Sequence, residues 1–149
     1  MTAALSKDII AHDLKTALHG KLEPAKLDAA VTQLTAANTA YSANGSVASM
    51  VFYLQFQVQM SINGVMYTFN GKGGGLSSPG GGALFGDVYT DNVQALIDNT
   101  VSFEFNCAFA YTSILFFDKN SNLLGSFQSG SVSTVAGVGG GSGEWTPKM

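Results

Sequence analysis

Hydrophobic and polar side chains alternate with a period of two between Ala48 and Ile62. The apolar set occupies the even positions and comprises Ala48, Met50, Phe52, Leu54, Phe56, Val58, Met60 and Ile62. Successive side chains of a β-strand point to opposite faces, so the pattern predicts one strand with a core face and a solvated face. The solvated face holds Tyr53, Gln55 and Gln57, which are the candidates for surface contact.

Turn residues divide the rest of the chain into further strands. Asn63-Gly64 suits a type I′ hairpin turn, so Val65–Gly73 is predicted to return as the partner of the first strand. A loop is expected at Gly73–Gly82, which holds two glycine triplets. The remaining predicted strands are Ala83–Thr90, Val101–Ala108, Tyr111–Phe117, Leu123–Ser129, Ser131–Ala136 and Ser142–Thr146.

One short helix is predicted within this part of the chain, at Asp91–Asn99, with Thr90 or Asp91 as its cap. About eight strands rich in aromatic residues are expected to close on themselves, because closure removes exposed edges and a barrel of that size is filled by its own side chains. A two-sheet sandwich is the alternative that the sequence leaves open.

Residues 1–44 follow a different pattern, with one of the 18 glycines, Gly20, and one aromatic residue, Tyr41. Apolar residues recur there at helical spacing, in one stretch that ends at Gly20 and another that begins at Pro24. A helical extension over residues 1–44, with a linker at Asn38–Gly45, is therefore predicted to precede a barrel domain over residues 45–149. The expected fold is an all-β closed eight-stranded antiparallel barrel with one short helix, preceded by this helical segment.

Charge and hydropathy exclude several classes of function. The net charge is -3, arginine is absent and the seven lysines are scattered, so no basic surface for nucleic acid is expected. No apolar run reaches the roughly 18 residues of a transmembrane helix. The first residues lack the basic and apolar regions of a signal peptide, so the sequence predicts none in this chain and leaves a cytoplasmic location open.

The few chemically reactive side chains do not form a recognisable site. Cys107 lies on the same strand face as Phe103 and Phe105, and the barrel segment has no histidine to activate it, so it is interpreted as a small buried hydrophobe. His12 and His19 share a helix face, but two histidines on a solvated helix are an insufficient ligand set, so no metal site is predicted.

The other candidates have ordinary structural interpretations. Glu104 alternates with buried aromatic positions and is interpreted as a solvated strand residue. The glycine clusters at 71–75 and 137–143 do not have the spacing of a phosphate-binding loop. Trp145 is expected to have a structural role, closing one end of the barrel. We therefore predict no catalytic residue, no cofactor and no enzymatic activity.

Several long motifs of the barrel segment follow one another in a recognisable order. They are Ser78-Pro-Gly-Gly-Gly-Ala-Leu-Phe-Gly86 with Tyr89-Thr90-Asp91, Ser102-Phe-Glu-Phe105, Phe116-Phe-Asp118 with Leu124-Gly125, and Ser131-Val-Ser-Thr-Val135 before Gly137-Val-Gly-Gly-Gly-Ser-Gly-Glu-Trp145. Over about residues 46–146 the chain thus resembles the virulence-associated proteins (the Vap family) of intracellular bacterial pathogens.

The resemblance implies a sealed eight-stranded barrel in a secreted, glycine-rich protein that acts on the host cell without enzymatic activity. The leading hypothesis is accordingly an effector that binds a host membrane surface or a protein partner. A small-ligand or sugar-binding module and an interaction or delivery module docked through the N-terminal helices are the alternatives. The oligomeric state is not indicated by the sequence.

Overall fold

The computed structural model describes residues 39–148 apart from positions 51, 78, 108–110 and 134–136. The strands are β1 Thr39–Ser49, β2 Tyr53–Ile62, β3 Val65–Ser77, β4 Gly80–Thr90, β5 Ser102–Cys107, β6 Tyr111–Phe117, β7 Leu123–Ser133 and β8 Gly137–Lys148. A helix, α3, spans Val93–Asn99 between β4 and β5. Residues 1–38, most of the predicted helical extension, lie outside the described residues.

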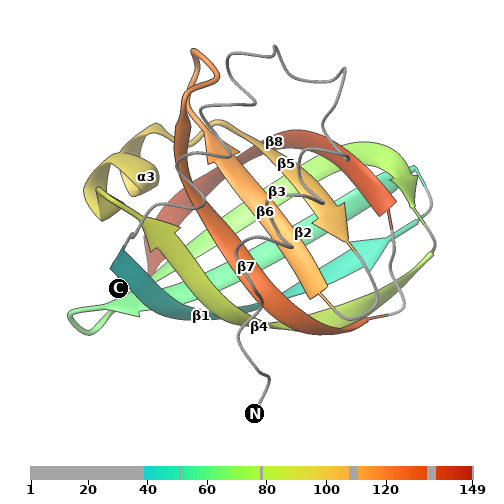
Figure 1. Cartoon of the computed structure of the whole chain (residues 1–149), viewed down its shortest axis with the longest axis horizontal. Helices are drawn as coiled ribbons and strands as arrows, with labels where there is room; N and C mark the ends of the chain where they lie inside the picture. The colour runs from blue at the N-terminus through green and yellow to red at the C-terminus, as the bar shows by residue number, and fades with distance from the viewer. Residues whose placement is uncertain (1–38, 51, 78, 108–110, 134–136, 149) are drawn as a thin grey trace.

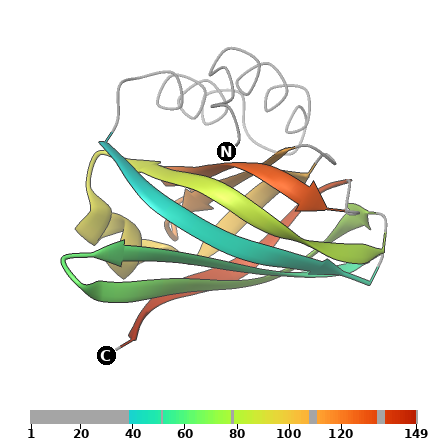
Figure 2. The same cartoon turned by 90° about the horizontal axis from the view of Figure 1, so that it is seen from below.

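The eight strands pair in the order β1-β2-β3-β8-β5-β6-β7-β4 and close into a barrel in which every neighbouring pair is antiparallel. The predicted closed barrel is confirmed and the sandwich alternative is wrong. Figure 1 shows the strands crossing the view obliquely with α3 at one end, and Figure 2 shows the same barrel from below. The α3 end also holds the C-terminal end of β8.

The predicted strand count agrees with the structure, but at two places the chain is divided into strands differently. The single strand expected over Ala48–Ile62 is two strands, because the chain turns between Ser49 and Leu54, which are paired across β1 and β2. Conversely, the two strands expected over Leu123–Ser129 and Ser131–Ala136 are one strand, β7, as far as Ser133.

The turn between β1 and β2 also corrects the predicted core face. The buried residues of β1 include Val47 and Ser49, whereas those of β2 begin at Leu54. Met50 and Phe52, assigned to the core by the alternation, have exposed fractions of 76% and 72%. Side chains alternate between two faces in a strand but not in a turn. A periodic sequence pattern that continues through a turn therefore does not predict which residues of the turn are buried.

Segments expected as loops are strands. The expected loop at Gly73–Gly82 consists mostly of the ends of β3 and β4, and β8 begins at Gly137, before the predicted strand start at Ser142. The expected linker at Asn38–Gly45 is strand from Thr39 onward, so residues 39–44 belong to β1 rather than to the extension. Glycine is poorly suited to most strands, but here β3 and β8 lie so close that a Cβ built on Gly73 would stand 2.6 Å from the carbonyl oxygen of Gly140.

Side chains fill the interior of the barrel. The largest fully buried ones are aromatic, namely Phe56, Phe69, Phe103, Phe105, Phe116 and Phe127. Their rings meet edge-on or tilted, as Phe56 and Phe103 do at a centroid distance of 5.5 Å. Trp145 is buried against Phe69 and Phe116, so its expected structural role is confirmed.

The helix α3 begins two residues later than predicted. Its N-cap is Asn92, whose side chain accepts a hydrogen bond from the backbone N–H of Ala95 at 3.0 Å, rather than Thr90 or Asp91. The Thr90 hydroxyl is engaged elsewhere, because it donates to the carbonyl oxygen of Leu124 at 2.7 Å and accepts from the Asn92 N–H. Thr90 therefore ties the end of β4 to β7 instead of capping the helix.

Candidate functional site

Among the described residues, the interior holds one thiol, that of Cys107. Its thiol is buried, and burial raises its pKa to about 11, with the neighbouring Thr112 side chain acting in the opposite direction. The thiol is therefore protonated at neutral pH, and the protonated form is a poor nucleophile. Cys107 packs within the hydrophobic core, as the sequence indicated.

Titratable groups do not converge elsewhere on the part of the barrel that is described. Within those residues, no group of three or more His, Cys, Asp or Glu side chains could hold a metal ion. Glu104 is half-buried on β5, where its carboxylate occupies the space that a side chain at Gly140 would take. His12 and His19 lie outside the described residues.

The outer faces of β2, β3 and β8 form a continuous polar surface, which we call the polar wall. It consists of Gln55, Gln57, Gln59, Thr68, Asn70, Lys72, Ser142, Glu144 and Thr146. The register sets these side chains in rows across the three strands, and the Gln57 amide donates to the Asn70 side-chain oxygen at 3.4 Å. Tyr53, with 45% of its surface exposed, precedes them on β2. The structure thus places all three predicted contact residues, Tyr53, Gln55 and Gln57, on an exposed outer face.

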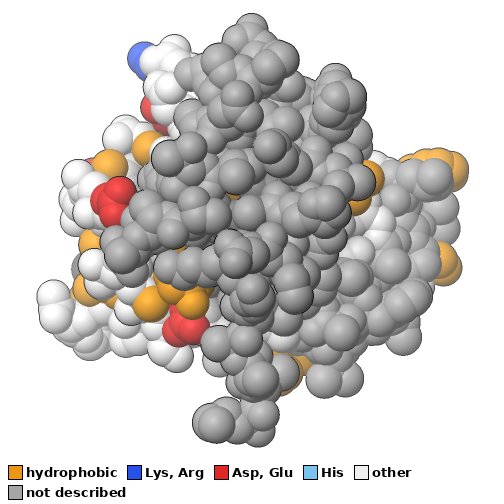
Figure 3. All heavy atoms as spheres, viewed as in Figure 1, with side chains coloured by type: hydrophobic (Ala, Val, Ile, Leu, Met, Phe, Trp, Pro, Cys, Tyr) orange, Lys and Arg blue, Asp and Glu red, His pale blue; other side chains and the backbone are white. Residues whose placement is uncertain are grey.

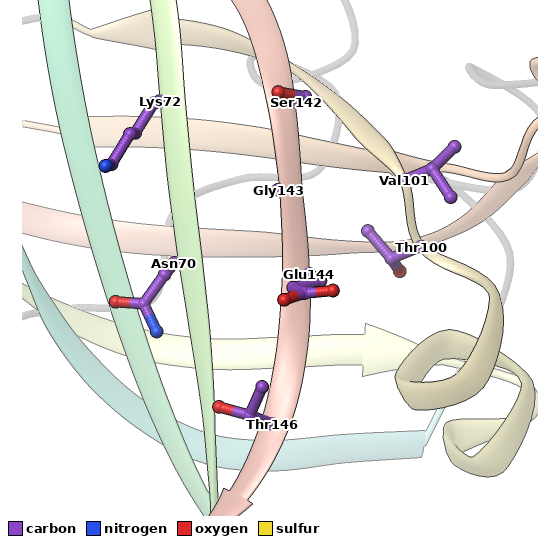
Figure 4. Close-up of a pocket in the computed structure, with 8 residues that line it drawn as sticks. All are labelled: Asn70, Lys72, Thr100, Val101, Ser142, Gly143, Glu144 and Thr146. Carbon is purple, nitrogen blue, oxygen red and sulfur yellow. The ribbon is translucent and has the colours of Figure 1, made fainter.

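A shallow groove of about 460 Å³ lies at the edge of the polar wall, which supplies most of its lining (Figure 4). Its lining is Asn70, Lys72, Thr100, Val101, Ser142, Gly143, Glu144 and Thr146. Strands β3 and β8 supply one side, and the connection from α3 to β5 supplies the other. The Gly143 N–H donates to the carbonyl oxygen of Val101 at 3.2 Å, which fastens that connection to β8.

The groove offers hydrogen-bonding groups rather than a catalytic arrangement. In Figure 4 the Lys72 ammonium points away from Glu144, so the cation and the carboxylate do not face a common point. General acid–base catalysis needs both groups within hydrogen-bond reach of one reacting atom. The groove was missed from the sequence because Thr100 and Val101 come from a connection distant along the chain from Asn70 and Glu144.

The end of the barrel opposite α3 has a different character, and we call it the apolar end. It is defined by strand ends that the register brings together, where Ser49 pairs with Gly80, Ser77 with Gly137 and Gly137 with Cys107. Met50 and Phe52 project there from the turn between β1 and β2. Hydrophobic side chains stand out at this end in Figure 3, on the right of the view. The alternation is interrupted in the run Met50-Val51-Phe52-Tyr53, because Val51 is apolar at an odd position, where a polar residue is expected. This interruption is the sequence signal that could have revealed the turn.

No helix among the described residues has the length and apolar character needed to cross a bilayer.

Comparison with known proteins connects this barrel to one family. The model of the Rhodococcus equi virulence-associated protein family matches residues 2–146. The solved structure of VapD from the intracellular pathogen Rhodococcus equi is 34% identical, with a TM-score of 0.71, and the match covers 73% of this chain and 98% of VapD. VapB from the same pathogen is 41% identical, with a TM-score of 0.67 and coverage of 74% and 98%. A search of curated proteins found no match.

Proposed function

The chain belongs to the Rhodococcus equi virulence-associated protein family, and from this premise we propose that it is a secreted, non-enzymatic effector whose barrel binds a host component, either a membrane surface or a protein partner. The observation that carries the proposal is the packing of the interior. Fully buried aromatic rings occupy the space in which a barrel of this size would hold a ligand or a reacting group. This packing supports a function at the outer surface.

Two parts of that surface support contact. The polar wall presents amide, hydroxyl and charged groups in regular rows, which suits hydrogen bonding to a polar partner. The apolar end presents two large hydrophobic side chains to solvent. Exposed apolar patches on soluble proteins commonly mark interaction sites.

A ligand-binding module is the second candidate, because the groove beside the polar wall has the volume of a small-molecule site and a polar lining. It is an open groove on the wall rather than an enclosed chamber, so a ligand there would remain largely solvated. Binding of this kind would be weak and would use the side-chain amide of Asn70 and the hydroxyl groups of Ser142 and Thr146.

The proposal is tested by offering the full chain to both partner classes. Sedimentation with lipid vesicles between about pH 5 and about pH 7, and affinity capture from host-cell extract, measure membrane and protein binding separately. We expect saturable binding in at least one assay and no turnover of hydrolase or transferase substrates by the same preparation. Failure of the protein to bind in both assays would overturn the proposal.

A further inference from the structure

The turn between β1 and β2 exposes the side chains of Met50 and Phe52, and the backbone N–H groups of these two residues are hydrogen-bonded within it. Met50 and Phe52 have exposed fractions of 76% and 72%. The Met50 N–H donates to the carbonyl oxygen of Tyr53 at 2.8 Å, and the Phe52 N–H donates to that of Met50 at 3.0 Å. Polar groups that are already hydrogen-bonded can leave water at little cost. The turn is therefore suited to apolar surroundings in its side chains and in these backbone groups.

The segments of sequence that join β1 to β2, β3 to β4, β5 to β6 and β7 to β8 contain no charged residue. They read Met-Val-Phe at 50–52, Ser-Pro at 78–79, Ala-Phe-Ala at 108–110 and Thr-Val-Ala at 134–136. Residues 39–71 and 120–143 contain no Asp, Glu, Lys, Arg or His at all. Desolvation of charged groups is the largest free-energy cost of entering a membrane. Transfer of the apolar end out of water does not incur that cost.

Charged residues lie at the opposite end of the barrel. The connection from β4 into α3 carries Asp91, the helix carries Asp98, and the connection from β6 to β7 carries Asp118 and Lys119. In Figure 3 the visible charged side chains lie on the side of α3, and the end that projects to the right shows none. The barrel is thus amphipathic along its long axis.

We propose that the apolar end inserts into the interfacial region of a lipid bilayer, with Met50 and Phe52 as the inserted side chains. The inference rests on the proposed function, since it selects the membrane from the two partner classes and assigns the contact to one end. We choose a bilayer as the partner because the turn projects outward and does not form a groove. A projecting apolar turn can be buried in the apolar layer of a membrane without a partner surface of complementary shape. The polar α3 end then remains in water.

Charge decides which lipid is expected. The four joining segments at 50–52, 78–79, 108–110 and 134–136 lack basic residues, and the whole chain carries a net charge of -3. Anionic lipids attract basic segments and repel acidic ones. Binding is therefore expected to be driven by apolar burial, to occur on zwitterionic phosphatidylcholine vesicles, and to gain nothing from added phosphatidylserine.

The test compares the full chain with two variants on phosphatidylcholine vesicles. Met50→Ser combined with Phe52→Ser removes both projecting side chains, and Met66→Ser removes an exposed methionine at the α3 end, where Met66 pairs with Lys148. The partition coefficient is expected to fall about tenfold per side chain, or about a hundredfold in the double variant, with Met66→Ser unchanged. Raising the salt from about 0.1 M to about 1 M should not weaken binding.

A second variant reports insertion directly. Phe52→Trp places a fluorophore in the turn, whereas the native Trp145 is buried and shielded from lipid. Vesicles should shift the emission of the new tryptophan to the blue. Thermal unfolding measured alongside confirms that each variant is folded.

Three results would overturn the inference. One is vesicle binding by the double variant at the wild-type level. Another is binding that requires anionic lipid. The third is that the wild type captures a host protein but does not bind vesicles, and that the double variant no longer captures this protein. The apolar end would then be a protein-binding site, and the proposed function would still hold. Absence of both vesicle and protein binding overturns the proposed function as well.

Discussion

The rings of Phe69 on β3 and Phe116 on β6 lie 4.9 Å apart between centroids, with their planes inclined at 70°. Strands β8 and β5 separate β3 from β6 in the sheet, so this contact crosses the interior of the barrel. Phe69 also meets Trp145 at 5.5 Å and Phe103 at 5.6 Å. One ring thus connects side chains from β5, β6 and β8 across the interior, which is the packing expected of a barrel filled by its own side chains.

Truncation of this ring should be severely destabilising. Phe69→Ala is expected to lower the free energy of unfolding by about 3–5 kcal/mol, because the vacated space cannot be refilled by a rigid wall. Chemical denaturation monitored by Trp145 fluorescence measures the change. Phe85, which is 50% exposed on β4, provides the matched control, and Phe85→Ala should cost less than about 1 kcal/mol. Similar losses for the two variants would contradict a close-packed interior.

Two adjacent glycines of β3 should respond differently to the same substitution. A Cβ on Gly73 would stand 2.6 Å from the Gly140 carbonyl oxygen, whereas a Cβ on Gly74 meets nothing nearer than the Phe52 carbonyl oxygen at 3.5 Å. Gly73→Ala is therefore expected to cost about 1–3 kcal/mol, because a backbone group must move, and Gly74→Ala should be close to neutral. Thermal unfolding of the two variants distinguishes them, and equal stability would show that β3 and β8 can separate without cost.

The sequence reported those features of the fold that depend on neighbours along the chain. Alternation at Leu54, Phe56 and Val58 is a local signal and predicted the buried face of β2 correctly. It also placed Tyr53, Gln55 and Gln57 on the outer face. Closure of the barrel followed from the number of strands and the need to remove edges.

Features that depend on distant residues were not predictable in this way. Gly73 looks like a loop residue until its neighbour Gly140, from the other end of the domain, is known. The groove likewise combines Thr100 with Asn70 and Glu144, which only the register of β3, β8 and the α3–β5 connection brings together. Met50 and Phe52 continue the apolar period of β2 through a turn, so the pattern alone concealed that they are exposed.

The cap of α3 gives a third comparison between neighbours. Asn92 accepts the Ala95 N–H at 3.0 Å, so Asn92→Ala should cost about 1 kcal/mol through loss of that bond at the helix start. Asp91 is exposed and is not the N-cap, and Asp91→Ala should change stability by less than about 0.5 kcal/mol. Denaturant titration of both variants checks the assignment, which a larger loss for Asp91→Ala would reverse.

The buried thiol of Cys107 should make stability fall at alkaline pH. Burial raises the pKa of this thiol from 9.0 to about 11, so between these values it is protonated in the native state and ionised in the unfolded state. The unfolded state then binds fewer protons than the native state, and stability is lost as pH rises above about 9, by at most about 1.4 kcal/mol per pH unit.

Comparison with Cys107→Ala isolates this contribution, since tyrosine ionisation affects both proteins alike. Unfolding free energies measured at about pH 8 and about pH 10 should decline more steeply for the wild type than for the variant. Thiol labelling provides an independent measurement, because a protonated thiol that is 4% exposed should react slowly until the protein unfolds. Rapid labelling of the native protein at neutral pH would show instead that the thiol is accessible. Parallel pH profiles of the unfolding free energy for the two proteins would show that it ionises normally. Either result would contradict the interpretation that Cys107 serves only in packing.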